Sequence, residues 1–186
     1  SLPGYGFSAK PAATGWGVER IAQAWAELMR RLGYTRWVAQ GGDWGAIVTA
    51  RMGGQAPQGL AGVHLNMPIA RRRREDFVDP GPEEQEAIAA GERYKNRESG
   101  YSAEQSTKPQ TIGYSLVDSP LGLAAWIYEK MMGWTDNQGR PEDALSRDTI
   151  LDNIMLYWLT GTGASAARLY WESFDAIGDA PPVLLP

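Results

Sequence analysis

The segment Gly41-Gly42-Asp43-Trp44-Gly45 constrains the fold of this chain more than any other. It follows a short β-favouring run, Arg36–Gln40, and precedes an apolar run, Ala46–Met52. Small residues placed two positions on either side of a nucleophile, between a strand and a helix, are typical of a nucleophile elbow. In that strained turn one side chain is lifted off the sheet. The sequence therefore predicts a strand, a tight turn and a helix, with Asp43 at the tip of the turn.

Asp43 has the chemistry that this turn requires. At the start of a helix, unpaired backbone N–H groups and the helix dipole favour an ionised carboxylate, which attacks carbon without a base to activate it. Gly41 and Gly45 are the small positions, and we expect a Cβ at either one to collide with the neighbouring chain, because the helix starts close beneath the strand. The alternative is that Asp43 only caps the following helix.

Helix and strand alternate on both sides of this turn. Residues Thr14–Leu32 place apolar side chains three and four residues apart, which predicts a helix with one apolar face, and Gly33 supplies its stop. After the turn and its helix, Leu60–Asn66 is mostly apolar, as buried parallel strands are. Helices that connect strands in this order predict a parallel sheet with right-handed crossovers.

The pattern changes after Pro68, where helix-like segments follow one another with almost no convincing strand. Leu121–Met132 and Asp148–Phe174 carry apolar and aromatic residues at helical spacing. We therefore expect an α/β fold in which a helical cap domain is inserted into a parallel sheet. The expected domains are part of the sheet core at 1–68, the cap at 69–178, and the start of a return to the core at 179–186.

Charge and composition narrow the class of partner to a small and neutral molecule. The 18 basic and 22 acidic residues give a formal charge of −4, which offers no general attraction for nucleic acid or an anionic membrane. With no Cys and a single His, neither a thiolate site nor a multi-histidine metal site can form, and we expect no metal and no cofactor. No membrane-spanning run or signal segment is evident, which favours a cytoplasmic protein. An oligomer is possible.

Several segments, taken in order, resemble the microsomal-type and juvenile-hormone-type epoxide hydrolases. Ser1–Ser8 resembles the segment after the fourth strand in α/β-hydrolases that open epoxides, and the elbow follows in its expected place. The other matching segments are Val63–Pro68, Glu98–Pro109, Asp118–Ile127 and Asn153–Thr162. The resemblance covers nearly the whole chain, and its cap motifs are more specific than the elbow, which other hydrolases share. It implies part of an α/β-hydrolase parallel sheet with an inserted helical cap.

The resemblance also implies a two-step reaction with named residues. Asp43 matches the nucleophile that opens an epoxide to a covalent glycol ester, which water then hydrolyses to a vicinal diol. Tyr101 and Tyr170 match the paired cap tyrosines, whose phenols donate hydrogen bonds to the epoxide oxygen as it gains charge. The backbone N–H of Trp44 would serve in the oxyanion hole, and its side chain would line the substrate pocket together with those two tyrosines. The remaining cap tyrosines are expected to be packing residues: Tyr94, Tyr114, Tyr128 and Tyr157.

The chain departs from the family pattern in the second step. Ester hydrolysis needs water activated by a His that an acidic residue orients, and the single His, His64, precedes the cap, whereas the catalytic His of the family follows it. We expect His64 to be a buried, hydrogen-bonded residue. The chain begins at Ser1 and ends in a Pro-rich approach to a strand, Ala180–Pro186. We therefore expect a fragment that lacks the His and acid and does not turn over alone.

Two other functions remain open at this stage. A haloalkane dehalogenase-like enzyme also resembles this chain in placing Trp after the elbow Asp, and its tryptophan N–H groups would hold a halide. The paired tyrosines favour an epoxide, because a developing alkoxide needs a proton-donating partner and a halide does not. The second alternative is a non-catalytic binding module that keeps the hydrolase fold and its pocket.

Overall fold

A computed structural model of the chain describes residues 1–69 and 79–176 and divides them into two compact units. The α/β unit comprises the described parts of Ala13–Pro80 and Glu172–Pro186. Its elements are α1 (Val18–Arg31), β1 (Trp37–Gly41), α2 (Trp44–Gln55), β2 (Leu60–Leu65), the end of α8 and η4 (Phe174–Ala176). The helical unit comprises Ser1–Ala12 and Gly81–Trp171. Its elements are α3 (Pro82–Arg93), η2 (Tyr94–Glu98), α4 (Gly100–Thr107), α5 (Pro109–Asp118), α6 (Pro120–Trp134), η3 (Pro141–Asp143), α7 (Arg147–Trp158) and most of α8 (Gly163–Ser173).

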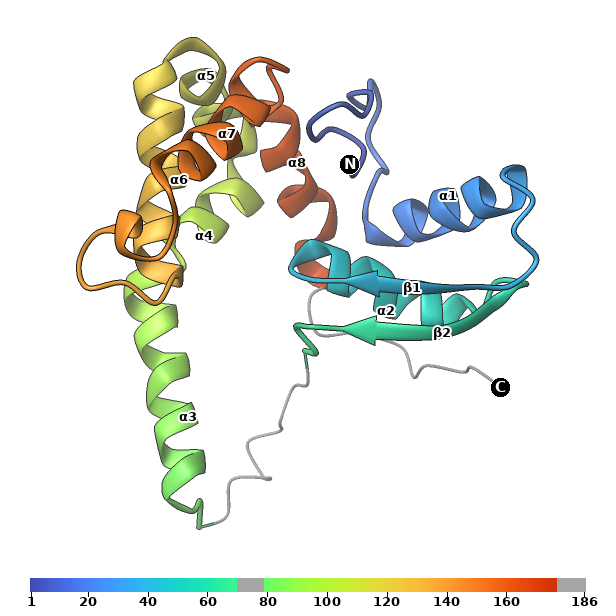
Figure 1. The fold of residues 1–186 in the computed structure, drawn as a ribbon, viewed down its shortest axis with the longest axis horizontal. Helices are drawn as coiled ribbons and strands as arrows, with labels where there is room; N and C mark the ends of the chain where they lie inside the picture. The colour runs from blue at the N-terminus through green and yellow to red at the C-terminus, as the bar shows by residue number, and fades with distance from the viewer. Residues whose placement is uncertain (70–78, 177–186) are drawn as a thin grey trace. The chain divides into compact units, whose positions relative to one another are not determined.

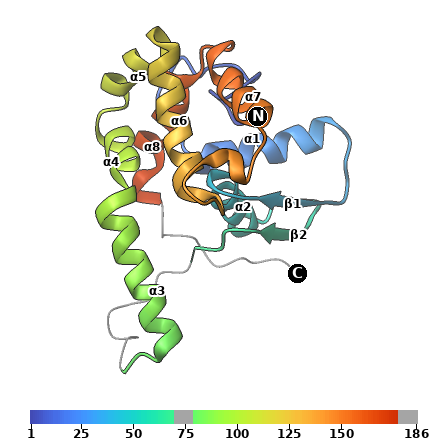
Figure 2. The same cartoon turned by 60° about the vertical axis from the view of Figure 1, so that its left-hand side comes forward.

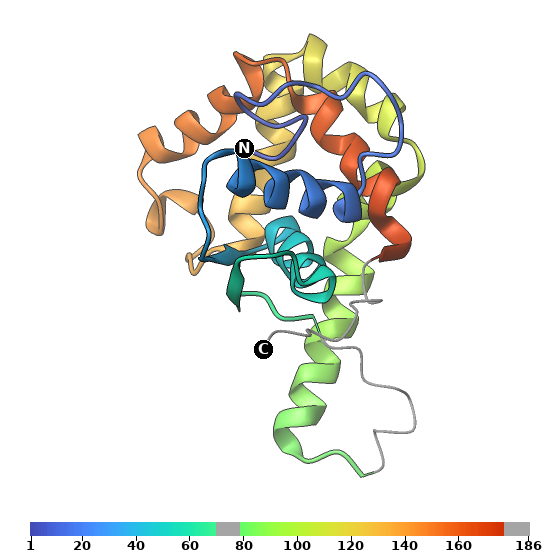
Figure 3. The same ribbon diagram turned by 90° about the vertical axis from the view of Figure 1, so that its right-hand side faces the viewer.

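The sheet of the α/β unit forms as the sequence predicts. β1 and β2 are parallel neighbours that are connected through α2, and Gln40 pairs with His64 while Gly41 pairs with Leu65 (Figure 1). Helix α2 packs against both strands, and α1 packs against α2 (Figure 3). The expected fold class, part of an α/β sheet followed by helices, is therefore confirmed.

Helix α1 buries one face and ends at a glycine. Val18, Ile21 and Ala22 are almost completely buried, in keeping with the apolar spacing of the segment. Gly33 has a φ of 78°, and the N–H of Tyr34 donates to the carbonyl of Met29 over 3.1 Å, which closes the helix in a Schellman-type end. The predicted stop at Gly33 is confirmed.

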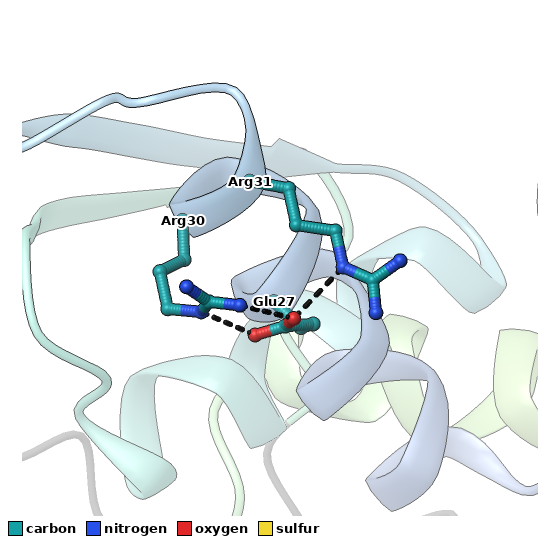
Figure 4. A network of polar contacts seen from close by, with 3 residues as sticks. All are labelled: Glu27, Arg30 and Arg31. Carbon is teal, nitrogen blue, oxygen red and sulfur yellow. Dashed lines mark hydrogen bonds and ion pairs between the residues drawn. The ribbon is translucent and has the colours of Figure 1, made fainter.

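The last turn of α1 carries an exposed charge network. The guanidinium groups of Arg30 and Arg31 each donate to the carboxylate of Glu27, with nitrogen–oxygen distances of 2.6 Å and 2.8 Å (Figure 4). Hydrogen bonds from Arg30 first, and then from Arg31, lower the pKa of Glu27 from 4.5 to about 2. Basic residues in the last turn of a helix also interact favourably with the negative end of the helix dipole.

The prediction that His64 is buried is wrong. His64 is exposed, as are Val38 and its own register partner Gln40. Side chains alternate between the two faces of a strand, so these residues share the face opposite to the buried positions of β1. The buried face of β1 contains Trp37 and Gly41. An apolar run suggested burial on both faces, whereas the described residues cover only one.

The helical unit is built around a small apolar core. Leu116, Leu123, Ile150 and Ile154 form its buried cluster, and they come from α5, α6 and α7. Helices α5 and α6 lie side by side (Figure 2). Helix α8 approaches α5 closely, because a Cβ at Gly163 would lie 2.7 Å from the Cβ of Leu116. Tyr170 therefore lies on a helix that packs closely against α5.

The apolar stretch Asp148–Phe174 forms more than one helix. Helix α7 ends at Trp158 and α8 begins at Gly163. Between them, Gly161 has a φ of 60°, a left-handed conformation that breaks the helical path. Residues 79–171, as far as the structure describes them, contain helices and no strand, in agreement with the expected helical segment.

The N-terminal residues lie against α8. The hydroxyl of Tyr5 donates to the carbonyl of Ala166 over 2.9 Å, and the hydroxyl of Ser165 donates to the carbonyl of Gly4 over 2.6 Å. This segment consequently belongs to the helical unit. The domain limits predicted from the sequence stay predictions, and the expected return to the core at 179–186 lies outside the described residues.

Candidate active site

Asp43 occupies a strained turn between β1 and α2. Its φ of 50° and ψ of −130° lie outside the regions that residues with a side chain usually adopt. Such a conformation costs on the order of 1–3 kcal/mol, and it persists only where the surrounding structure enforces it. The Asp43 side chain is exposed at this turn. The strain at a non-glycine residue and the exposed carboxylate are the features that the elbow prediction requires.

Helix capping alone does not account for this geometry. An ordinary capping Asp adopts an extended backbone and accepts a hydrogen bond from the second or third residue of the helix. Asp43 has a positive φ, and its Oδ1 accepts from the N–H of Trp44, the first residue of α2, over 2.6 Å. A less strained backbone would suffice for capping. The Trp44 N–H, expected in the oxyanion hole, therefore already contacts the carboxylate.

The two small positions of the elbow differ in what they require. A Cβ on Gly41 would lie 2.0 Å from the carbonyl oxygen of Gly45, so this position excludes any side chain. The expected collision at Gly45 is wrong, because a Cβ there meets no atom of the described residues within 4 Å. The close contact involves the backbone of Gly45, whereas a Cβ on Gly45 would point into open space.

The end of β2 is tied to the elbow. The backbone N–H of Asn66 donates to the carbonyl of Gly41 over 3.2 Å, and the side-chain amide of Gln40 donates to the Asn66 side chain. The Asn66 amide would also lie 3.4 Å from a Cβ on Gly42. These contacts fix the strand end that leads into Asp43.

Tyr101 and Tyr170 lie together within the helical unit. Tyr101 is on α4 and Tyr170 is on α8, and their rings meet edge to face with centroids 5.8 Å apart. The Tyr101 ring also meets the ring of Trp134 on α6, with centroids 5.3 Å apart. Both tyrosines are half-buried. The two tyrosines, which the family resemblance predicted as a pair, are thus adjacent in the structure. Asp43 and Trp44 belong to the α/β unit.

The other cap tyrosines have different surroundings. Tyr157 is half-buried and packs on the ring of Tyr5, which agrees with a packing role. The Tyr128 hydroxyl donates to the Glu142 carboxylate over 2.9 Å, and this hydrogen bond raises the pKa of Tyr128 above its usual value. Tyr114 is 65% exposed, so a packing role is wrong for that residue.

Two contacts to Tyr101 were not anticipated from the sequence. Tyr94 is 43% exposed and its hydroxyl lies 3.1 Å from the hydroxyl of Tyr101, so a packing role is wrong for Tyr94 as well. The ammonium of Lys130 lies over the Tyr101 ring, 4.7 Å from its centroid. Tyr94 precedes Tyr101 by two helical turns, a spacing that could have revealed the first contact. Lys130 comes from another helix, and no local pattern connects it to Tyr101.

Comparison with known proteins gives the class to which this fold and elbow belong. The family model described as the alpha/beta hydrolase fold matches residues 1–116. The chain belongs to the α/β-hydrolase fold family. Among the helices that the structure describes, none is long and apolar enough to cross a membrane.

Individual relatives narrow the resemblance to epoxide hydrolases. The chain is 60% identical over 93% of its length to a Stigmatella aurantiaca protein named "Putative epoxide hydrolase", covering 39% of that protein. It is 37% identical over 93% of its length to epoxide hydrolase 1 of Sus scrofa, covering 42% of it. The crystal structure of juvenile hormone epoxide hydrolase from Bombyx mori matches all of this chain at 35% identity and a TM-score of 0.86.

These matches confirm the resemblance expected from the sequence. They also show that the chain spans about two fifths of the length of the curated relatives, with shares of 39% and 42%, and 50% of the Bombyx mori chain. The residues that correspond to the rest of those proteins are not part of this sequence.

Proposed function

We propose that the protein to which this chain belongs is an epoxide hydrolase in which Asp43 is the nucleophile. The observation that carries the proposal is the strained Asp43 backbone, at a φ of 50°, which presents an exposed carboxylate at the start of α2. The relatives named above support the reaction type. The substrate would be a small epoxide, and water would be the second reactant.

In the first step, a carboxylate oxygen of Asp43 attacks one ring carbon of the epoxide. The bond between that carbon and the epoxide oxygen breaks, and an ester forms. The oxygen gains charge and takes a proton from Tyr101 or Tyr170. Two donors at one oxygen favour the transition state over the ground state, because their hydrogen bonds strengthen as alkoxide charge develops. The adjacent rings of the two tyrosines support this shared role.

In the second step, water adds to the ester carbonyl, and the alkoxide of the diol leaves as the Asp43 carboxylate is restored. One proton of the water goes to that alkoxide, and the other restores the tyrosine that gave up its proton in the first step. The Trp44 N–H, which contacts the Asp43 carboxylate in the structure, would hold the oxyanion of this step. The water needs a base, and the only His of the chain, His64, lies exposed on β2. We propose that a His and an acidic residue elsewhere in the parent protein supply this function, so that the chain alone is inactive in turnover.

The proposal is tested by assaying the full-length protein for a vicinal diol and for halide release. Diol formed from an epoxide, lost in Asp43→Asn and retained in the matched variant Asp152→Asn, an exposed position on α7, supports it. Halide release from a haloalkane without diol formation would instead identify a dehalogenase. Binding of both substrates with no product would identify a non-catalytic module. A cytoplasmic location also stays a proposal, which fractionation of the source cells would test.

A further inference from the structure

Lys130 on α6 is held against the aromatic rings around Tyr101. Its ammonium nitrogen lies 4.7 Å from the centroid of the Tyr101 ring and 5.6 Å from that of Trp134. Only 14% of its side chain is exposed. A cation at this separation from an aromatic face is attracted by the ring's electrons.

Two further contacts fix the position of this charge. The Lys130 ammonium donates to the backbone carbonyl of Glu98 over 3.3 Å. It also pairs with the carboxylate of Glu129, which is 53% exposed, at a distance of 2.7 Å. The flexible lysine is thereby held in one place, so its charge acts on Tyr101 from a fixed position.

We infer that Lys130 is a positioning residue for Tyr101: it fixes the ring in place and strengthens the phenol as a proton donor. The ammonium lies over the face of the ring, so its effect on the epoxide would pass through the Tyr101 phenol. Lys130 therefore acts through Tyr101. The part of this inference that concerns proton donation to an epoxide rests on the proposed function. The effect of the charge on the phenol does not.

The physical basis is the stabilisation of negative charge. When the phenol gives up its proton, its ring becomes more electron-rich, so a nearby cation stabilises the phenolate more than the neutral phenol. The exposed Glu129 offsets part of the Lys130 charge. Two further titratable groups contact Tyr101: Tyr94, through its hydroxyl, and Tyr170, through its ring. Glu104 lies three residues after Tyr101 on α4, and Glu98 offers its backbone carbonyl to Lys130. Lys130 supplies a positive charge over the face of this ring.

The first measurement follows the titration of Tyr101 itself. The full-length protein is labelled with 3-fluorotyrosine, and the resonance missing in Tyr101→Phe is followed against pH by fluorine NMR. Lys130→Gln removes the charge and keeps a donor for the Glu98 carbonyl, while Lys130→Arg keeps the charge. We expect Lys130→Gln to raise the pKa of Tyr101 by about one unit. Lys130→Arg and the exposed control Lys95→Gln should leave that pKa close to the wild-type value.

Glu129→Gln provides a second, opposite test at an exposed position. Removing its carboxylate leaves the Lys130 charge less compensated, so the pKa of Tyr101 should fall. This variant keeps the test decisive if Lys130→Gln does not fold. The inference is overturned if Tyr101 titrates as in wild type in every variant that folds. It is also overturned if Lys130→Arg behaves like Lys130→Gln.

The rate of ester formation supplies the functional measurement. In single-turnover experiments, Lys130→Gln should slow ester formation by about 10-fold, and Lys130→Arg should restore most of the rate. An unchanged rate with a raised pKa would overturn the role in proton donation. If the wild-type protein forms no ester, the proposed function fails, yet the NMR titration still decides whether Lys130 acts on Tyr101.

Discussion

The rings of Tyr101 on α4 and Tyr170 on α8 meet edge to face at an interplanar angle of 82°, although the two residues are far apart in the sequence. Edge-to-face contact fixes the relative orientation of two aromatic side chains and contributes about 0.5–1.5 kcal/mol beyond burial. Helix α8 is held near α5 by the contact of Gly163 with Leu116. The pair is consequently a product of the packing of the helical unit, and it supports the proposal that the two phenols act on one oxygen.

Tyr101→Phe and Tyr170→Phe should each slow ester formation by about 100-fold, because each variant loses one donor to the developing alkoxide. The measurement is the single-turnover rate of the full-length protein with an epoxide. Tyr114→Phe is the matched control, since Tyr114 is 65% exposed, and its rate should equal that of wild type. Equal rates in all three variants would remove the tyrosines from the mechanism.

Gly41→Ala should destabilise the protein by about 3 kcal/mol, because the new methyl group would overlap the Gly45 carbonyl oxygen. Gly45→Ala is the matched change on the other side of Asp43. It should stay within about 1 kcal/mol of wild type, since its Cβ meets open space and Ala favours the helix. Denaturant unfolding measures both, and similar losses for the two variants would contradict the elbow geometry.

Leu123→Ala should cost about 3 kcal/mol of stability, because Leu123 is 1% exposed at the centre of the helical unit and its truncation leaves a cavity. Leu121→Ala, two residues earlier on α6, is the control. Leu121 is 78% exposed, so its truncation should change stability by less than about 0.5 kcal/mol. Equal effects in thermal unfolding would mean that the cluster around Leu123 is not the core of this unit.

The contribution of Glu27 to stability should depend on pH. Its pKa is lowered from 4.5 to about 2 in the folded state by Arg30 and Arg31. A carboxylate whose pKa is lower in the folded state than in the unfolded state stabilises the protein at any pH above its unfolded-state pKa. That stabilisation disappears as the pH falls from 4.5 towards 2. Glu27→Gln should therefore have a slightly lower Tm than wild type at neutral pH, and the two should converge in acid. Because the groups are exposed, high salt should reduce the difference. A difference independent of pH and salt would contradict the charge network.

Much of the fold follows from local pattern in the sequence. Gly33 ends α1 because a left-handed residue is needed there, and the elbow glycines mark the turn between β1 and α2. The exposure of His64 could not be predicted from local pattern. The apolar residues of a strand do not indicate which of its faces is covered by another element. Which face of β2 is exposed therefore depends on tertiary packing, which local pattern does not predict.

The residues of the candidate site also differ in whether local pattern predicts them. Asp43 lies within a motif of consecutive residues, so its backbone and its contact with Trp44 are local properties. Tyr101 and Tyr170 were found only through family resemblance, since a tyrosine at helical spacing is usually a packing residue. The contact of Lys130 with Tyr101 could not be predicted from local spacing, because it arises where side chains of α6 reach the Tyr101 ring on α4.

The most direct test of Asp43 as the nucleophile is the fate of water oxygen during turnover. The full-length protein is incubated with an epoxide in water enriched in oxygen-18, and the tryptic peptide Trp37–Arg51 is analysed by mass spectrometry. If Asp43 forms the ester, water attacks the ester carbonyl, so oxygen-18 enters the Asp43 carboxylate only when epoxide is present. Labelled diol with an unlabelled Asp43 would mean that water opens the epoxide directly, and it would contradict the assignment.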